Sequence, residues 1–263
     1  MTRSAAGRPV LPRPPAERAG RTRLPAPGEC HLWLVPVCPR PGWLPMLDAG
    51  ERHKAGRLTG TPAGDVFVTS RGTQRLVGSA YLGVPPSAVV TDRDCPHCAA
   101  PGKQPDKHGR PRFRAAPFDY SVSHTEKWLL LAVAGAGLVG ADIEDLNAVP
   151  DPEALAKASL SPGEQRHYAR LRPAEQPQWL LSSWTRKEAA MKLTGLGLQA
   201  PPNLVDVRGP VATVGAVPGW PAGPVHLHRI GAPGGHVAAL ATTVPLLGLQ
   251  RFDLPEAELA RPA

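Results

Sequence analysis

The sequence predicts an α+β fold made of two similar lobes in one chain. Segments rich in β-forming residues are interspersed with segments that carry helix start and stop signals. The first half shows the order strand, helices, strand, and the second half shows strands, helices, strands. This order favours a duplicated arrangement, although the halves share too little identity to show a repeat. The length of 263 residues suits one large domain or two lobes of roughly 100–130 residues each.

The first half is expected to hold two strands and two helices. Residues 30–37, CHLWLVPV, are apolar and β-forming and predict a strand. Residues 47–58 predict a short polar helix. Residues 66–83 predict a longer helix, because their apolar residues recur every three to four positions and the pattern closes on a glycine. Residues 89–93 predict a second strand, after which a loop rich in Cys, Pro and Gly marks a candidate lobe boundary.

The second half is expected to begin with three consecutive strands, at residues 118–124, 128–134 and 138–144. The short segments TEK and GAG between them suit tight turns, so the pattern predicts an antiparallel meander. Capping residues followed by proline predict helix starts near Asp151 and Ser161. A third helix is predicted over residues 174–194, and late strands are predicted at 203–207, 224–230 and 236–243.

Residues 1–28 are expected to form a disordered tail, because they are rich in Pro, Arg, Gly and Ala and have no apolar periodicity. This start is not typical of a signal peptide, and the chain has no run of eighteen apolar residues, so we expect a cytoplasmic protein without a membrane span. The predicted lobes are residues 29–117 and 118–250.

The charge of the chain is unevenly distributed. The net charge is +8, and the tail, with six arginines and Glu17, supplies +5 of it, which leaves +3 for the rest. A mildly basic folded part argues against a dedicated nucleic-acid binder. It suits a small phosphate ligand or an acidic protein partner.

The pair Cys95 and Cys98, in the segment CPHC, has the spacing of metal ligands. A structural zinc site usually needs a second ligand pair, and the sequence contains no second C-x-x-C motif. We therefore expect a Pro-rich loop with two surface thiols and no bound zinc.

Two carboxylates share one face of the predicted strand at 138–144. Strand alternation sends Val139, Ala141 and Ile143 to one face and Asp142 and Glu144 to the other. Two solvated acids on an edge strand would explain this pair. The alternative is a cation site, because neighbouring carboxylates repel each other and their hard oxygen atoms suit Mg²⁺.

The segment SSWTRKEAAMKLTGLGL, residues 182–198, raises a similar choice. Glu188 and Lys192 are four residues apart and share a helix face with Trp184 and Gly195. An ordinary surface ion pair, worth about 0.3–0.5 kcal/mol, is one explanation. The other is a third Mg²⁺ carboxylate beside an ammonium group that binds phosphate.

Ser123 and His124 are adjacent in the segment YSVSHTEK. Neighbours on a strand point to opposite faces, so His124 is not expected to activate Ser123 as in a serine hydrolase. His124 is expected to be either a neutral buried histidine or a donor to a phosphate or ribose.

Together, the segments Ser-Val-Ser-His (121–124), Gly-Ala-Asp-Ile-Glu (140–144) and Trp-Thr-Arg-Lys-Glu-Ala-Ala-Met-Lys-Leu-Thr-Gly-Leu-Gly (184–197) resemble those of the 4′-phosphopantetheinyl transferases. The long, two-lobed type that activates peptide and polyketide synthases is the most similar. The likeness covers roughly residues 30–245. The chain departs from the family at Ser121, where Asn is common, at Thr125 and Ala141, and in a longer loop at 95–111.

The resemblance implies two α+β lobes in a pseudo-dimeric fold, with coenzyme A bound between them and Mg²⁺ at its pyrophosphate. By position, it implies Mg²⁺ ligation by Asp142, Glu144 and Glu188. It also implies that Lys192 contacts the phosphates and that His124 contacts the 3′-phosphorylated ribose end. Ser123 is a further expected coenzyme-binding residue, and Lys54, Arg71 and Arg110 are expected to be basic coenzyme contacts. Glu188, directly or through a water, is the candidate general base.

The implied reaction transfers the 4′-phosphopantetheine group from coenzyme A to a serine of an apo acyl or peptidyl carrier protein and releases 3′,5′-ADP. The expected protein is a cytoplasmic monomer with no nucleic-acid or membrane partner. Two alternatives remain at this point: a nucleotide- or nucleic-acid-binding module without catalysis, and a Mg²⁺-dependent phosphohydrolase.

Overall fold

The computed structural model describes residues 22–94, 109–148 and 151–254. The CPHC segment and residues 1–21 of the predicted tail lie outside this part of the chain. Within it, the α+β fold is confirmed.

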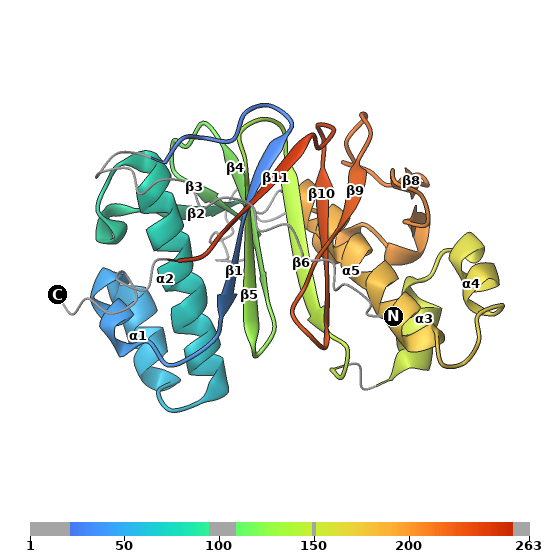
Figure 1. Ribbon diagram of the computed structural model, residues 1–263, viewed down its shortest axis with the longest axis horizontal. Coiled ribbons are helices and arrows are strands. Elements are labelled where there is room, and N and C mark those ends of the chain that lie inside the picture. The colour runs from blue at the N-terminus through green and yellow to red at the C-terminus, as the bar shows by residue number, and fades with distance from the viewer. Residues whose placement is uncertain (1–21, 95–108, 149–150, 255–263) are drawn as a thin grey trace, which may run out of the picture.

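Two sheets packed face to face form the middle of the molecule (Figure 1). The first sheet has the strand order β11-β1-β5-β4, and the second has the order β6-β10-β9. The first comprises β1 Glu29–Pro36, β4 Asp119–His124, β5 Trp128–Ala134 and β11 Gly248–Phe252, and the second comprises β6 Val139–Asp145, β9 His226–Ile230 and β10 His236–Thr242.

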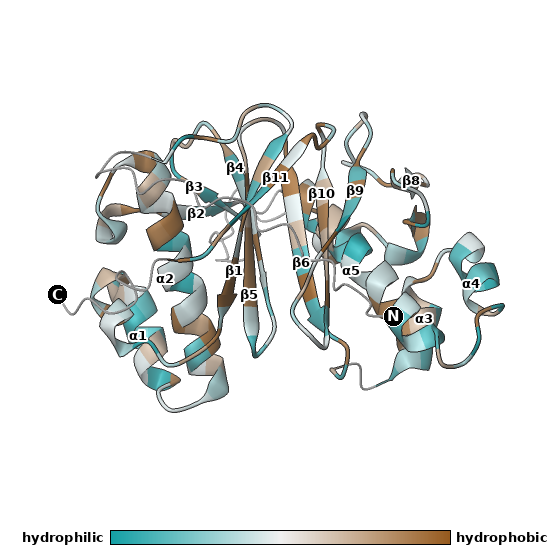
Figure 2. Cartoon of the chain, in the orientation of Figure 1, coloured by the Kyte–Doolittle hydropathy of each residue, from teal (hydrophilic) through white to brown (hydrophobic). Residues whose placement is uncertain are grey.

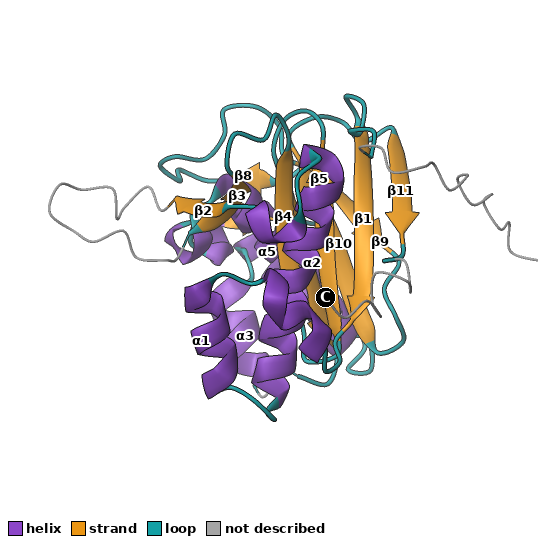
Figure 3. Cartoon of the chain, turned by 90° about the vertical axis from the view of Figure 1, so that its left-hand side faces the viewer, coloured by secondary structure: helices purple, strands orange, loops and turns teal. Residues whose placement is uncertain are grey.

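Helices cover the outer faces of both sheets, so the layers run helix, sheet, sheet, helix (Figure 1). In the turned view, α1 and α2 lie in front of the first sheet (Figure 3). The helices are α1 Ala49–Arg57, α2 Pro62–Leu82, α3 Pro152–Ser159, α4 Pro162–Tyr168 and α5 Gln176–Thr194. Shorter elements are η1 Pro41–Met46, η2 Pro86–Ala88, η3 Gly197–Gln199, η4 Pro202–Leu204, β2 Thr91–Asp94, β3 Arg110–Phe113, β7 Val205–Asp206 and β8 Thr213–Val214.

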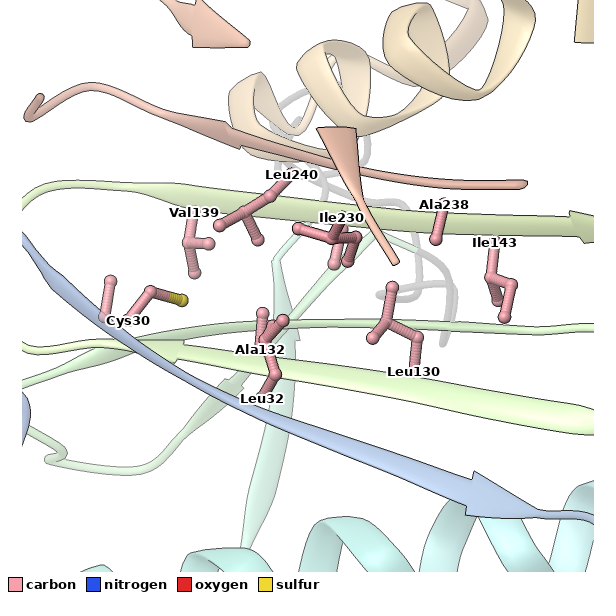
Figure 4. Close-up of a cluster of buried hydrophobic side chains, with 11 residues drawn as sticks. Cys30, Leu32, Leu130, Ala132, Val139, Ile143, Ile230, Ala238 and Leu240 are labelled. Carbon is pink, nitrogen blue, oxygen red and sulfur yellow. The ribbon is translucent and has the colours of Figure 1, made fainter. Parts of the chain in front are cut away.

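The apolar core between the sheets follows from strand alternation. Leu32 from β1, Leu130 and Ala132 from β5, Ile143 from β6 and Leu240 from β10 meet there (Figure 4). The strands β1 and β5 are largely coloured as hydrophobic, whereas the helices mix hydrophobic and hydrophilic residues (Figure 2). Burial of this apolar surface holds the two sheets together.

The structure corrects the predicted meander. β4 and β5 pair antiparallel as expected, but β6 leaves the first sheet and pairs antiparallel with β10. The reason lies in the side chains of Val139, Ala141 and Ile143. They face side chains of β1 and β5 across the gap between the sheets, whereas the side chains of a strand hydrogen-bonded to β5 would lie beside those of β5 and could not face them. β4 and β5, assigned by sequence to the second lobe, therefore lie in the first sheet with β1, and the chain changes sheets between residues 134 and 139 rather than near residue 117.

The predicted tail is too long at its C-terminal end. Pro25 and Gly28 are buried, and the Thr22 amide donates to the Ala80 carbonyl over 2.8 Å. Leu24 packs against the core between the first sheet and α2. Residues 22–28 therefore belong to the folded part of the chain.

These contacts predict a difference between two truncations. Removal of residues 1–21 should leave the melting temperature unchanged, because this segment has no apolar periodicity. Removal of residues 1–28 should lower it, by about 2–4 °C for each kcal/mol of packing lost. Equal melting temperatures for the two truncated proteins, measured by calorimetry, would contradict the assignment of residues 22–28 to the fold.

Candidate active site

A cleft of about 1210 Å³ opens along the line where β4 and β6 meet. Its walls come from α1 and α2, from β4 and the segment after it, from the end of β6, and from the end of α5. Seven of the nine predicted site residues line it: Lys54, Arg71, Arg110, Ser123, His124, Glu144 and Lys192. Asp142, which is buried, and the partly exposed Glu188 are not among the residues that line it.

The packing of α5 on β6 brings the acidic residues together. At Gly140 a Cβ atom would collide with the carbonyl oxygen of Ala189, so the helix backbone lies directly on the strand. Asp142 and Glu144 follow Gly140 at alternate positions and share its face of β6. Glu188 and Lys192 lie on α5 one residue before and three residues after Ala189, so the helix presents them to that face.

Asp142, Lys192 and Ser123 form a closed triangle of hydrogen bonds. Lys192 Nζ lies 2.6 Å from Asp142 Oδ1 and 2.8 Å from Ser123 Oγ. Ser123 Oγ donates to the same Oδ1 atom over 2.7 Å. Asp142 is 1% exposed, and its Oδ2 atom is buried without a hydrogen-bond partner in the described part of the protein. One carboxylate oxygen is therefore held by the protein and the other remains available.

The neighbouring glutamates are hard to ionise. Burial, together with the Asp142 and Glu188 charges, raises the pKa of Glu144 to about 7, against the opposing effects of Lys192 and Trp184. Burial and the Asp142 charge also raise the pKa of Glu188. Asp142, Glu144 and Glu188 thus share the one ammonium group of Lys192, and their full ionisation would leave an excess of negative charge.

These donors fit a divalent cation chemically. They are hard oxygen atoms, one is buried and unpaired, and their mutual repulsion would be relieved by positive charge. Among the described residues, however, no three His, Cys, Asp or Glu side chains already stand close enough to act as a ligand set. Lys192 holds the oxygen of Asp142 that points toward the cleft residue Ser123.

Cationic side chains line the opposite wall. Lys54 Nζ and Arg71 Cζ lie 4.9 and 5.5 Å from the ring centroid of Phe67. Arg93 from β2 lines the same wall, and its pKa is lowered by burial and by the Arg71 charge. Sequence reasoning missed Arg93 and Phe67, because a single arginine in a short strand and a phenylalanine in a helix carry no motif.

Arg110 lies between the two walls. It is buried, pairs with Asp119 and donates to the Val139 carbonyl over 2.7 Å. Its Nε and Nη1 atoms have no partner among the described residues. Arg110 therefore connects β3, β4 and β6, with donors to spare. His124 is exposed to the cleft, and partial burial followed by the Lys192 charge lowers its pKa.

Lys187, the neighbour of Glu188, points away from the cleft. It is fully buried, lies 2.6 Å from Glu164 Oε2 and donates to the carbonyls of Pro202 and Val205. Glu164 also accepts from the amides of Ser161 and Val207. Lys187 thus connects α5 to α4 and β7, and these contacts stabilise the fold.

Lys187→Met should destabilise the protein by about 3–5 kcal/mol, because it leaves the Glu164 carboxylate buried and unpaired. Denaturant unfolding of this variant and of Lys157→Met, on the exposed face of α3, measures the difference. Similar unfolding free energies for the two variants would show that the buried pair does not hold α5.

The raised pKa of Glu144 predicts how the metal-free protein responds to pH. The folded chain binds this proton more tightly than the unfolded chain, in which the pKa is 4.5. The stabilising contribution is therefore complete below pH 4.5 and is lost as the pH rises through about 7. Melting temperatures measured with a chelator present should fall between pH 4.5 and about 7. The fall should be smaller in Glu144→Gln, which lacks the titrating group, than in the control Glu153→Gln. Identical pH profiles for the two variants would contradict the assignment.

Comparison with known proteins assigns the family. Residues 138–234, which contain Asp142, Glu144, Glu188 and Lys192, match the model of the 4′-phosphopantetheinyl transferase superfamily. The 4′-phosphopantetheinyl transferase HetI of Nostoc sp. is 32% identical over 181 residues, which are 65% of this chain and 70% of that protein.

Shorter matches agree with this result. The 4′-phosphopantetheinyl transferase AcpT of Salmonella typhimurium is 36% identical over 90 residues, 34% of this chain and 47% of that protein. The 4′-phosphopantetheinyl transferase psf-1 of Bacillus pumilus is 34% identical over 92 residues, 35% of this chain and 38% of that protein.

A cleft between two α+β halves, with an acidic cluster facing a cationic wall, suits a class of protein that binds a phosphorylated ligand. The chain belongs to the 4′-phosphopantetheinyl transferase superfamily. Membership favours catalysis over the binding module and the phosphohydrolase considered above. In the described part of the chain, none of the helices has the length and apolar character needed to cross a membrane.

Proposed function

We propose that this enzyme transfers the 4′-phosphopantetheine group of coenzyme A to a serine of an apo acyl or peptidyl carrier protein, in a Mg²⁺-dependent reaction that releases 3′,5′-ADP. Carrier proteins of peptide and polyketide synthases are the proposed partners, and a cytoplasmic monomer is the proposed form. The observation that carries the proposal is the placement of Asp142, Lys192 and Ser123 beside two glutamates of raised pKa, across a cleft from Lys54 and Arg71.

The two walls suit the two kinds of charge in the reaction. Lys54, Arg71 and the spare donors of Arg110 would bind the phosphates of coenzyme A, and His124 would donate to its ribose end. Asp142, Glu144 and Glu188 would hold Mg²⁺, which supplies charge neutralisation at the pyrophosphate when it is bound. Ser123 would then act mainly by orienting Asp142 and Lys192, because both hold its hydroxyl.

The bond changes define the tasks of Glu188 and Lys192. The carrier serine oxygen attacks the β-phosphorus of coenzyme A, and the bond from that phosphorus to the bridging oxygen breaks. Glu188, directly or through a water, would take the serine proton. Lys192 stabilises the charge that develops on the departing 3′,5′-ADP.

Intact-mass analysis of an apo carrier protein mixed with this enzyme, coenzyme A and Mg²⁺ tests the proposal. The carrier should gain the mass of one phosphopantetheine group, and omission of Mg²⁺ should prevent the gain. Glu188→Gln should slow transfer by about 10²–10⁴-fold, as expected for the loss of a positioned base. The control Glu153→Gln lies on an exposed face of α3 and should match the parent.

The same assay separates the alternatives. Release of phosphate from coenzyme A without a carrier would identify a phosphohydrolase. Transfer by Glu188→Gln at the parent rate would refute the role given to Glu188 while leaving the family activity intact.

A further inference from the structure

The inner face of β4 is polar, although the same face of its neighbour β5 is apolar. Tyr120 and the partly buried Val122 point toward α2, and Asp119, Ser121 and Ser123 alternate with them and are all buried. Leu130 and Ala132 of β5, which pair with Ser123 and Ser121, belong to the core between the sheets. The polar face of β4 therefore requires a different partner from the apolar face of β5.

That partner is the backbone edge of β6. On its other edge β6 pairs with β10. Toward β4, the Val139 amide donates to Asp119 Oδ2 over 2.7 Å, and the Ala141 amide donates to Ser121 Oγ over 3.0 Å. Ser123 Oγ then reaches the Asp142 carboxylate. We call these three contacts the seam: side chains of β4 take the place of a neighbouring strand.

One end of the seam is fixed by charge. The Arg110 guanidinium pairs with Asp119 and also donates to the carbonyl of Val139, the residue whose amide Asp119 accepts. The other end is the triangle of Ser123, Asp142 and Lys192. Ser121 lies midway and holds the amide of the residue directly before Asp142.

We infer that Ser121 is a positioning residue, which fixes the backbone at Ala141 and thereby sets where the Asp142 carboxylate lies relative to the coenzyme-binding wall. The inference rests on the proposed function of the cleft. Ser121 is 4% exposed, so removal of its hydroxyl leaves a buried backbone amide unpaired, and the strand edge must move to satisfy that amide. A shift of a fraction of an ångström is enough to weaken a cation site or a transition-state contact.

The backbone contact is tested first, in the metal-free protein. Ser121→Ala should speed hydrogen exchange of the Ala141 amide by about tenfold, because one hydrogen bond to a buried amide is lost. Ser121→Thr keeps the hydroxyl and should restore slow exchange. The control Ser159→Ala removes another buried hydroxyl, which is bound to the Leu155 carbonyl in α3, and should leave Ala141 unchanged.

The functional consequence is tested by calorimetric titration with Mg²⁺ and by kinetics. Ser121→Ala should weaken Mg²⁺ binding and lower kcat by roughly tenfold, the lower end of the range for groups that orient metal ligands. At saturating Mg²⁺ the KM for coenzyme A should change little, because Lys54 and Arg71 lie on the other wall. Ser121→Thr should recover both properties. Ser121→Cys, of similar size, serves in its place if the alanine variant does not fold.

The outcomes are distinguishable. Faster exchange at Ala141 combined with Mg²⁺ binding and kcat equal to those of Ser159→Ala would overturn the inference and leave the seam a structural feature. Failure of the parent protein to load any carrier would refute the proposed function, and the exchange and Mg²⁺ titrations would still decide whether Ser121 positions Asp142.

Discussion

The direct contact between α5 and β6 at Gly140 is the constraint on which the site depends. Because no Cβ intervenes, the helix backbone approaches the strand closely enough for Ala189 and Leu193 to join the core on that side. The same approach places Glu188 and Lys192 against Asp142 and Glu144. An alanine at position 140 would force the helix away and separate these groups, although it would change no functional side chain.

The site combines burial with an excess of negative charge, which is unfavourable for folding alone. Lys192 offsets one carboxylate, and burial together with the Asp142 charge raises the pKa of both Glu144 and Glu188, so these two groups take up protons more readily than exposed glutamates. In contrast, the buried Lys187, which lies one residue and about 100° around the helix axis from Glu188, is balanced by Glu164. Both members of this pair make further hydrogen bonds to backbone groups. Of two adjacent residues of α5, Lys187 thus stabilises the fold, whereas Glu188 lies in the acidic cluster of the site.

Alternation and helix periodicity were sufficient to predict that Asp142 shares a face with Glu144, and Glu188 with Lys192, since both patterns are local. Sequence could not show that β6 leaves β5 for β10, because the GAG turn suits either path and the choice is made by side chains meeting across the core. Lys187 was indistinguishable from its charged neighbours until Glu164, distant in sequence, was placed beside it. The strand β11 was missed because GLQRF becomes a strand by pairing in parallel with β1, a long-range contact. The roles of the individual site residues remain predictions.

The opposed charges of the cleft walls bear on the order of events in the proposed reaction. Coenzyme A is anionic, so Lys54 and Arg71 attract it, while Glu144 and Asp142 repel its pyrophosphate. Positive charge at the carboxylates removes that repulsion, and bound phosphates in turn add oxygen donors for the cation. On the proposed function, the two ligands must therefore strengthen each other's binding, and by thermodynamic reciprocity the factor is the same in both directions. The seam holds β4 beside β6, where the carboxylates lie, so Asp119 and Ser121 bear on this coupling although the proposal gives them no contact with either ligand.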